Sequence, residues 1–213
     1  PQLQAANPVA RLGPAPKLLE GQAWSDAVAI RRRADGGYTV AHGHSSVHAL
    51  VPASFREMFR FLPAFRASPE SIRFTLGGDF LRALATPARW ALDRPSPFER
   101  GRVLNPAPAA RELREMRAAL DTQLPEIAGA PFVETWAGMI EASPDVLPFI
   151  APIDSIGDFY VASGFSGHGF GIGPGAGRLV ADMVRGAADP ETLRRFRLDR
   201  FFDGSPIVPG PAI

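Results

Sequence analysis

The chain has 213 residues, of which 46% are hydrophobic, so it is long enough to bury a core and to form one large or two small domains. Its formal net charge is +1, from 23 basic and 22 acidic side chains, which argues against nucleic-acid binding and against an acidic disordered tail. Cysteine is absent, so disulfides, thiolate nucleophiles and cysteine-ligated metal centres are excluded. No apolar run approaches the roughly 20 residues of a membrane-spanning helix.

The N-terminal part predicts a β-hairpin followed by a helix. Residues 28–33 and 38–41 form strand-like segments around an Ala-Asp-Gly-Gly turn, a pattern typical of a hairpin. Residues 52–65 carry large apolar side chains at spacings of three and four, with Pro52 suited to the first helical turn. The apolar positions of this predicted helix are Phe55, Met58, Phe59 and Leu62.

The next segment predicts a strand and then an irregular excursion. Residues 71–76 have the composition of a strand. Residues 80–92 favour a helix, but Pro87 and the run 93–97 interrupt that pattern.

A second helix and a pair of strands follow. The helix is predicted to have Asn105 as its N-cap and Pro106 at its first helical position, and to end before Pro125. Residues 132–140 and 146–150 predict strands on either side of a Ser-Pro-Asp turn. The apolar face of the helix consists of Ala109, Leu113, Met116, Leu120 and Leu124.

A glycine-rich segment near the C-terminus carries the strongest functional signal. Residues 158–163 predict a strand that leads into a glycine-rich loop at 164–175, residues 176–186 predict a helix behind it, and residues 192–202 a last short helix. Glycines cost backbone entropy on ordering, so this loop is expected to approach another group closely. A turn of this kind lets backbone N–H groups and the positive end of a helix face a phosphate or a flavin. The spacing matches neither G-x-G-x-x-G nor a Walker loop, and a tightly packed strand-to-helix crossover is the alternative.

Three motifs resemble one family of flavoenzymes. The string GFSGHGF at 164–170, with Pro174 and Gly177 behind it, resembles the C-terminal motif of the D-amino-acid oxidase, glycine oxidase and sarcosine oxidase superfamily. The string WAG at 136–138 and the Ser-Pro-Asp turn resemble that family's tryptophan-glycine segment and its Thr-Pro-Asp turn. Residues 31–38 are similar to its Arg-x-x-x-Asp-Gly-Gly hairpin.

The resemblance implies an α/β (α+β) fold in which a substrate domain with a mainly antiparallel sheet is joined to the C-terminal strand and helix of a Rossmann-like FAD domain. It places the substrate domain at 1–130, the C-terminal part of the FAD domain at 131–189, and a terminal helix and tail at 190–213. The family's pyrophosphate-binding G-x-G-x-x-G has no counterpart here, so we expect it on an N-terminal FAD-binding segment or on a partner chain. The chain begins Pro-Gln-Leu-Gln, without Met, which favours a fragment or a processed product.

The reaction that the resemblance implies is FAD-dependent oxidation of a C–N bond in a small amine or amino acid, with hydride transfer to the flavin. His168 is the candidate catalytic residue: it either packs on the flavin ring or binds a flavin oxygen, and the alternative is a loop histidine bonded to the backbone. The candidate cofactor-binding residues are Trp136, Gly138, Gly164, Ser166, Gly167, His168, Gly169, Phe170, Gly171 and Ile172.

Two positions depart from the family pattern. Relatives of sarcosine oxidase have a Lys where this chain has Gly171, and the stretch after Gly138, where glycine and D-amino-acid oxidases have an Arg, contains none. Arg31, Arg33 and Glu141 are therefore candidate substrate contacts, although arginines on a strand are more simply solvated.

Other interpretations stay open. His42, His44 and His48 resemble a metal cluster, but no regular helix or nearby carboxylate supports one, so no metal site is expected. Alternative functions are a non-catalytic subunit that completes a separate flavin-binding chain, or a phosphate-ligand module. The isolated chain is expected to be inactive and weakly stable, because its last strand and helix would lack most of their sheet. The expected location is the cytoplasm, or a membrane surface reached through an electron acceptor.

Overall fold

The computed structural model describes residues 1–43, 46–87 and 89–210, and it divides the chain into two compact units. The sheet unit consists of Ala5–Pro52 and Glu70–Met139. The C-terminal unit consists of Pro1–Gln4, Ala53–Pro69 and Ile140–Ile213. Among the described residues, no helix combines the length and the apolar composition needed to cross a lipid bilayer.

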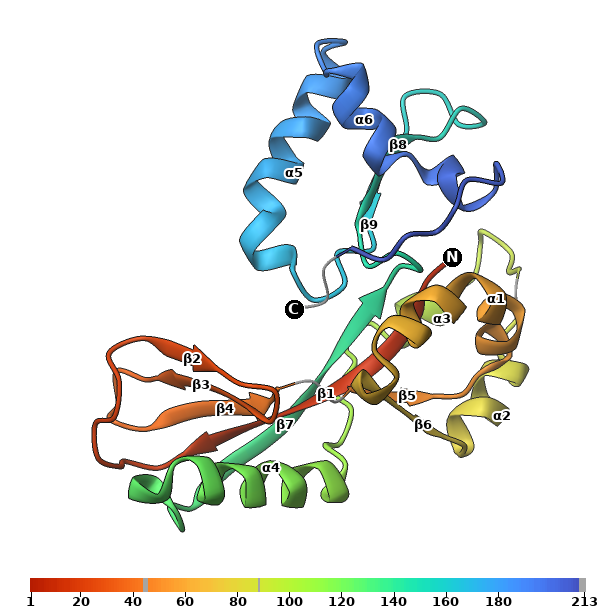
Figure 1. Ribbon diagram of the computed structural model, residues 1–213. Coiled ribbons are helices and arrows are strands. Elements are labelled where there is room, and N and C mark those ends of the chain that lie inside the picture. Colours follow the sequence, from red (N-terminus) through yellow and green to blue (C-terminus); the bar gives the residue numbers. More distant parts are fainter. Residues whose placement is uncertain (44–45, 88, 211–213) are drawn as a thin grey trace. The chain divides into compact units, whose positions relative to one another are not determined.

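A seven-stranded sheet dominates the sheet unit (Figure 1). Its order is β2-β3-β4-β1-β5-β6, and β7 also pairs with β1. The pairs β1–β4, β1–β5, β2–β3 and β3–β4 are antiparallel, and only β5–β6 is parallel among these neighbours, which confirms the mainly antiparallel sheet and mixed α/β fold. The strands are β1 (Leu3–Leu12), β2 (Gln22–Trp24), β3 (Val28–Arg32), β4 (Tyr38–His42), β5 (Ser46–Ala49), β6 (Ile72–Thr75) and β7 (Phe132–Ala142).

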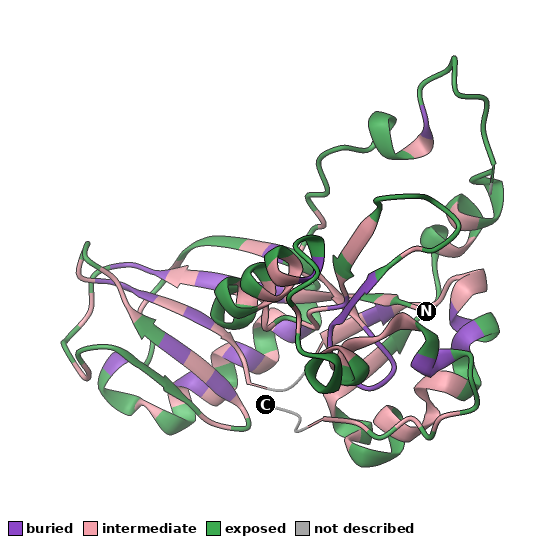
Figure 2. Cartoon of the chain, turned by 90° about the horizontal axis from the view of Figure 1, so that it is seen from above, coloured by how far each residue is buried: buried purple, intermediate pink, exposed green. Residues whose placement is uncertain are grey.

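The predicted hairpin is confirmed as β3 and β4, with Val28 opposite His42 and Arg32 opposite Tyr38. Its turn is held by Asp35, whose Oδ1 accepts the Gly37 N–H at 3.0 Å. Buried residues alternate along these strands (Figure 2), as a sheet with one covered face requires.

Helix α4 (Ala110–Gln123) covers that face (Figure 1). The core formed between them contains Ala10, Leu12, Val28, Ile30, Tyr38, Val40, Met116, Leu120 and Ile127. Tyr38 is fully buried, and its hydroxyl is satisfied because it donates to the Pro16 carbonyl and accepts the Leu18 N–H, both at 2.8 Å. The predicted apolar face of α4 is confirmed by Met116 and Leu120, which are fully buried.

The predicted start of α4 at Asn105 is wrong. The helix begins at Ala110, and its N-cap Ala109 makes no side-chain cap bond. Proline disfavours helical geometry in the residue before it, so Pro108 excludes Ala107 from a helix that begins at Pro106.

The segment between β5 and α4 contains α1 (Pro52–Ala67), the 3-10 turn η1 (Pro69–Ser71), α2 (Gly78–Ala85) and the short α3 (Pro97–Arg100). The helix predicted over 52–65 is confirmed, but its apolar stripe is not the buried face: Phe55 and Phe59 are 56% and 76% exposed, whereas Glu57 is buried. Arg60 joins this face to another element, because it pairs with Glu57 on the same helix at 2.9 Å and its Nε donates to the Phe201 carbonyl at 3.1 Å. Helix α2 ends before Pro87, the residue predicted to interrupt the helical pattern of residues 80–92.

The rest of the C-terminal unit contains a two-stranded antiparallel sheet, formed by β8 (Phe149–Pro152) and β9 (Tyr160–Ser163). Helices α5 (Gly169–Val184) and α6 (Pro190–Phe196) and the 3-10 turn η3 (Leu198–Phe201) follow; the 3-10 turn η2 (Pro125–Ile127), which precedes β7, belongs to the sheet unit. The strand predicted from residue 146 begins only at Phe149, because Val146 lies in a turn with a φ of 62°. The last helix predicted over 192–202 is divided between α6 and η3.

Helix α5 begins seven residues earlier than the predicted start at Ala176, so much of the expected loop is helical. Its partly or fully buried positions run back from Met183 through Val180 and Ala176 to Gly173 and Gly169, at spacings of three and four. The helical period therefore continues through glycines, which contribute no apolar side chain to the sequence pattern.

Candidate cofactor site at the start of helix α5

The turn between β9 and α5 has an unusual backbone. Gly164, Ser166 and Gly167 have φ values of +74°, +52° and +87°. A non-glycine residue in this region carries strain, so the surroundings of Ser166 must hold it there. At Gly164 a Cβ atom would also lie 2.9 Å from Cε1 of Phe149, so both the conformation and the packing require glycine.

Three hydrogen bonds hold this turn from the side. The Phe165 N–H donates to Oε1 of Glu141 at 3.1 Å, and the Ser143 N–H donates to Oγ of Ser166 at 3.2 Å. The Ser166 hydroxyl in turn donates to the Gly164 carbonyl at 3.1 Å. Glu141, a candidate substrate contact, thus uses one carboxylate oxygen to hold the loop backbone.

The first turn of α5 offers free donors. The His168 N–H donates to the Phe165 carbonyl at 2.9 Å, and the Gly171 N–H to the His168 carbonyl at 3.0 Å. Within the described part of the chain, the N–H groups of Gly169 and Phe170 have no backbone acceptor. These two donors sit at the positive end of a 16-residue helix, which suits an anionic or carbonyl oxygen of a ligand.

The side chains around these donors leave space. His168 is partly buried and makes no capping bond to the helix, and the Phe170 side chain is fully exposed. At the exposed Gly171, no atom other than its neighbours and the backbone of the helix lies within 4 Å of where a Cβ would be. A planar ring can therefore approach the backbone here without meeting a side chain at this position.

The structure brings together only some of the predicted site residues. The candidates from Gly164 to Ile172 form one continuous turn and helix start in the C-terminal unit, joined by Glu141. Trp136 and Gly138 lie on β7 in the sheet unit.

The two candidate arginines also lie in the sheet unit, on and just after β3. Arg33 is held by Asp35 at 3.1 Å and by the Thr39 hydroxyl at 3.2 Å, whereas Arg31 is exposed. The described residues contain no group of three His, Cys, Asp or Glu suited to a metal ion, and His44 of the histidine cluster lies outside them.

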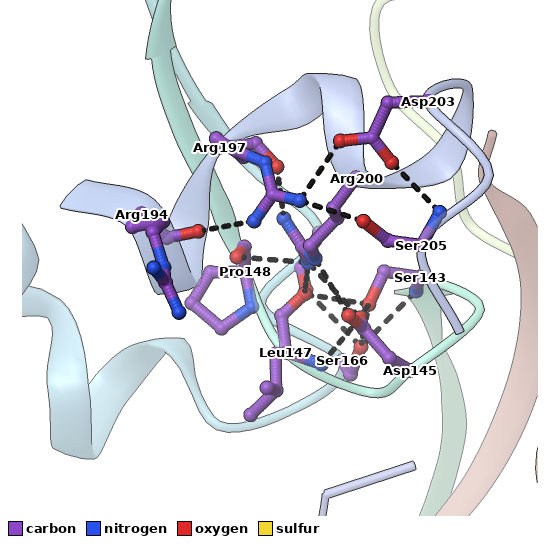
Figure 3. A network of polar contacts seen from close by, with 11 residues as sticks. Ser143, Asp145, Leu147, Pro148, Ser166, Arg194, Arg197, Arg200, Asp203 and Ser205 are labelled. Carbon is purple, nitrogen blue, oxygen red and sulfur yellow. Dashed lines mark hydrogen bonds and ion pairs between the residues drawn. The ribbon is translucent and has the colours of Figure 1, made fainter. Parts of the chain in front are cut away.

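A buried ion pair between Arg200 and Asp145, in the same unit as the turn into α5, was not predicted from the sequence (Figure 3). Arg200 binds Asp145 through two hydrogen bonds, Nε to Oδ2 at 2.6 Å and Nη2 to Oδ1 at 3.0 Å. Asp145 appeared in the sequence as a turn residue, but Arg200 gave no signal because it is one of several arginines in the segment predicted as the last helix. Their separation of 55 residues places this contact beyond any local pattern.

Comparison with known proteins identifies the family. Residues 21–183 match the family model described as FAD dependent oxidoreductase (DAO). The chain is 26% identical over 136 residues to a glycine oxidase of Pseudomonas aeruginosa, covering 59% of this chain and 36% of that protein. A glycine oxidase of Pseudomonas putida is 27% identical over 137 residues, with the same coverage.

Solved structures agree with this match. An L-amino acid deaminase from Proteus myxofaciens, in complex with anthranilate, superposes with a TM-score of 0.85 at 26% identity, covering 94% of this chain and 45% of that one. An L-proline dehydrogenase from P. horikoshii, at 18% identity and a TM-score of 0.64, shares the fold. The chain thus spans less than half the length of these relatives. The predicted resemblance is confirmed, and the chain belongs to the DAO family of FAD dependent oxidoreductases.

Proposed function

We propose that this chain forms the C-terminal part of an FAD-dependent enzyme that oxidises a C–N bond of an amino acid or amine. The observation that carries this proposal is the turn into α5, where two free N–H donors stand at a helix start inside the segment that matches the flavoenzyme family. The bound flavin would accept a hydride from the carbon next to the amine.

The residues of the turn would serve this reaction by holding and polarising the ring. The N–H groups of Gly169 and Phe170 would donate to an oxygen or nitrogen of the flavin and stabilise negative charge there. Gly171 would allow close approach of the ring to the helix backbone. His168, at the N-cap of α5, would pack on the ring or bind one of its oxygens. Ser166 and Gly167 would give the turn its shape.

For the substrate, the relatives support an amino acid, since they include glycine oxidases and an L-amino acid deaminase. The stretch directly after Gly138, Met139 to Glu141, contains no Arg, so the carboxylate of an amino-acid substrate needs another ligand. Of the three candidates we favour Arg31, because Arg33 is held by Asp35 and Thr39, and Glu141 is held by the Phe165 N–H and repels a carboxylate.

The two-stranded sheet of the C-terminal unit is an argument for a further segment or chain that pairs with it. A pair of strands alone is marginally stable, and β8 contains the buried residues Phe149, Ile150 and Ala151. We propose that an N-terminal FAD-binding segment or a partner chain adds strands to it and supplies the pyrophosphate site. In this proposal residues 1–130 form the substrate domain, residues 131–189 complete the FAD domain, and residues 190–213 form the terminal helix and tail. A location in the cytoplasm, or at a membrane-bound electron acceptor, belongs to the same proposal.

Anaerobic substrate bleaching tests the proposed reaction. The flavin-loaded protein, containing this chain and the polypeptide that completes its flavin site, is mixed without oxygen with L-amino acids, D-amino acids, glycine and simple amines. The expected result is loss of the blue absorbance with at least one of them and release of the matching keto or oxo product. Without oxygen the readout is the same for an oxidase and a dehydrogenase. A flavin that stays oxidised with all of them, yet is reduced by dithionite, would contradict the proposal and favour a non-catalytic subunit.

A further inference from the structure

The buried side chain of Arg200 makes hydrogen bonds to several separate parts of the C-terminal unit. Besides its two bonds to Asp145, Nη2 donates to the carbonyls of Leu147 and Pro148 at 3.0 and 3.2 Å, and Nη1 donates to the Arg197 carbonyl at 2.7 Å (Figure 3). Its guanidinium also lies 4.1 Å from the centre of the Phe201 ring. The side chains of Arg200 and Asp145 are both more than nine-tenths buried, so the ion pair is shielded from water. Each nitrogen of the Arg200 guanidinium nevertheless has a hydrogen-bond acceptor.

Asp145 connects Arg200 to the turn before β8 through further hydrogen bonds. Its Oδ1 accepts the Leu147 N–H at 3.1 Å and the Ser143 hydroxyl at 3.2 Å. The same hydroxyl lies 2.7 Å from the Leu147 carbonyl, and Ser143 is fully buried. Arg200 thereby fixes residues 143–148 as one rigid turn.

That turn contacts the candidate cofactor loop at Ser166. The Ser143 N–H donates to Oγ of Ser166 at 3.2 Å, and the two hydroxyl oxygens are 3.5 Å apart (Figure 3). Ser166 is the loop residue with a positive φ that is not a glycine, a conformation that persists only when neighbouring groups enforce it. Three residues later α5 begins and presents the free N–H groups of Gly169 and Phe170.

We propose that Arg200 is a positioning residue for the flavin: acting through Asp145, Ser143 and Ser166, it fixes the direction in which the first N–H groups of α5 point. This inference rests on the proposed function, because it takes the ligand of those groups to be the flavin. Donors aimed at negative charge stabilise the reduced ring more than the oxidised one, so their aim sets the midpoint potential. A clamp that served stability alone would leave that potential unchanged.

The test is a potentiometric titration of the flavin-loaded protein and of three variants. Arg200→Lys keeps the positive charge but loses the planar fork that binds Asp145. Ser143→Ala removes the hydroxyl that donates to Asp145 and so breaks the link at a second point, while the backbone N–H of residue 143 still donates to Ser166. Arg197→Gln is the matched control: its side chain binds Asp203, Ser205 and the Arg194 carbonyl, and it makes no bond to the turn at 143–148.

We expect Arg200→Lys and Ser143→Ala each to weaken binding of reduced flavin relative to oxidised flavin about tenfold, which for a two-electron couple is about 30 mV toward negative potential. Arg197→Gln should keep the potential of the unaltered protein. If Arg200→Lys does not fold, Ser143→Ala decides. Variants that lose thermal stability but keep the original potential would overturn the positioning role. An unaltered protein that binds no flavin would instead contradict the proposed function, and this inference with it.

Discussion

Replacing Gly164 with Ala tests the geometry of the loop that enters α5. The new Cβ would lie 2.9 and 3.0 Å from two ring carbons of Phe149, which is buried, and 3.3 Å from Cβ of Ser143. Alanine in the left-handed region costs roughly 1–2 kcal/mol, and overpacking of a filled site costs roughly 1–3 kcal/mol. Gly164→Ala should therefore lower the free energy of unfolding by about 2–5 kcal/mol.

Gly175→Ala is the matched control, because Gly175 lies inside α5, has no positive φ, and has no atom within 4 Å of the place that a Cβ would take. There alanine should stabilise the chain by about 0.5–1 kcal/mol, since glycine is the poorer helix former. Urea unfolding followed by circular dichroism measures both variants, and a difference of this size corresponds to about 1 M or more in the midpoint. Equal midpoints for the two variants would refute the backbone conformation assigned to the loop.

Three further predictions concern other contacts. Tyr38→Phe should cost about 1–3 kcal/mol in urea unfolding, because it leaves the Leu18 N–H and the Pro16 carbonyl without their partner; an unchanged midpoint would contradict this. The Gly37 N–H and Arg33 lower the pKa of Asp35, and Arg111 and Arg73 lower the pKa of Glu115. Their stabilising contribution is therefore complete only above the unfolded pKa values of 3.8 for Asp35 and 4.5 for Glu115 and is lost as the pH falls through the lower folded values, so the urea midpoint should drop in acid, and less steeply in Asp35→Asn. Gly171→Ala should weaken flavin binding about tenfold, roughly 1.4 kcal/mol, in the completed protein, because the new methyl group would occupy the place where the ring is proposed to approach the backbone; equal affinity by fluorescence titration would contradict that approach.

The parts of the fold that the sequence predicts are those with local signals. The β3–β4 hairpin has a turn and two strands within a few residues of each other, and Met116 and Leu120 repeat at helical spacing, so both are visible in the chain itself. The start of α5 is not visible in the sequence, because Gly169 and Gly173 occupy inward positions without an apolar side chain. The buried face of α1 is not visible either, since Arg60, which pairs with Glu57 on the same helix, donates to the distant Phe201 carbonyl on the face opposite the apolar stripe.

The candidate site likewise has one part that a local sequence motif predicts and another part that it does not. The glycine-rich motif marks the turn at 164–168, because its glycines follow from backbone geometry that few other residues adopt. The residues that hold this turn, Ser143 and Arg200, act through contacts over 23 and 55 residues of sequence and leave no periodic trace. Only the folded chain reveals them.

The most direct test of the flavoenzyme assignment is the absorbance spectrum of the intact purified protein, combined with mass spectrometry of its polypeptides. We expect flavin bands in the near ultraviolet and the blue, together with a polypeptide segment that carries G-x-G-x-x-G, on the same chain or on a partner. A folded, colourless protein that contains such a segment and still takes up no added FAD would contradict it.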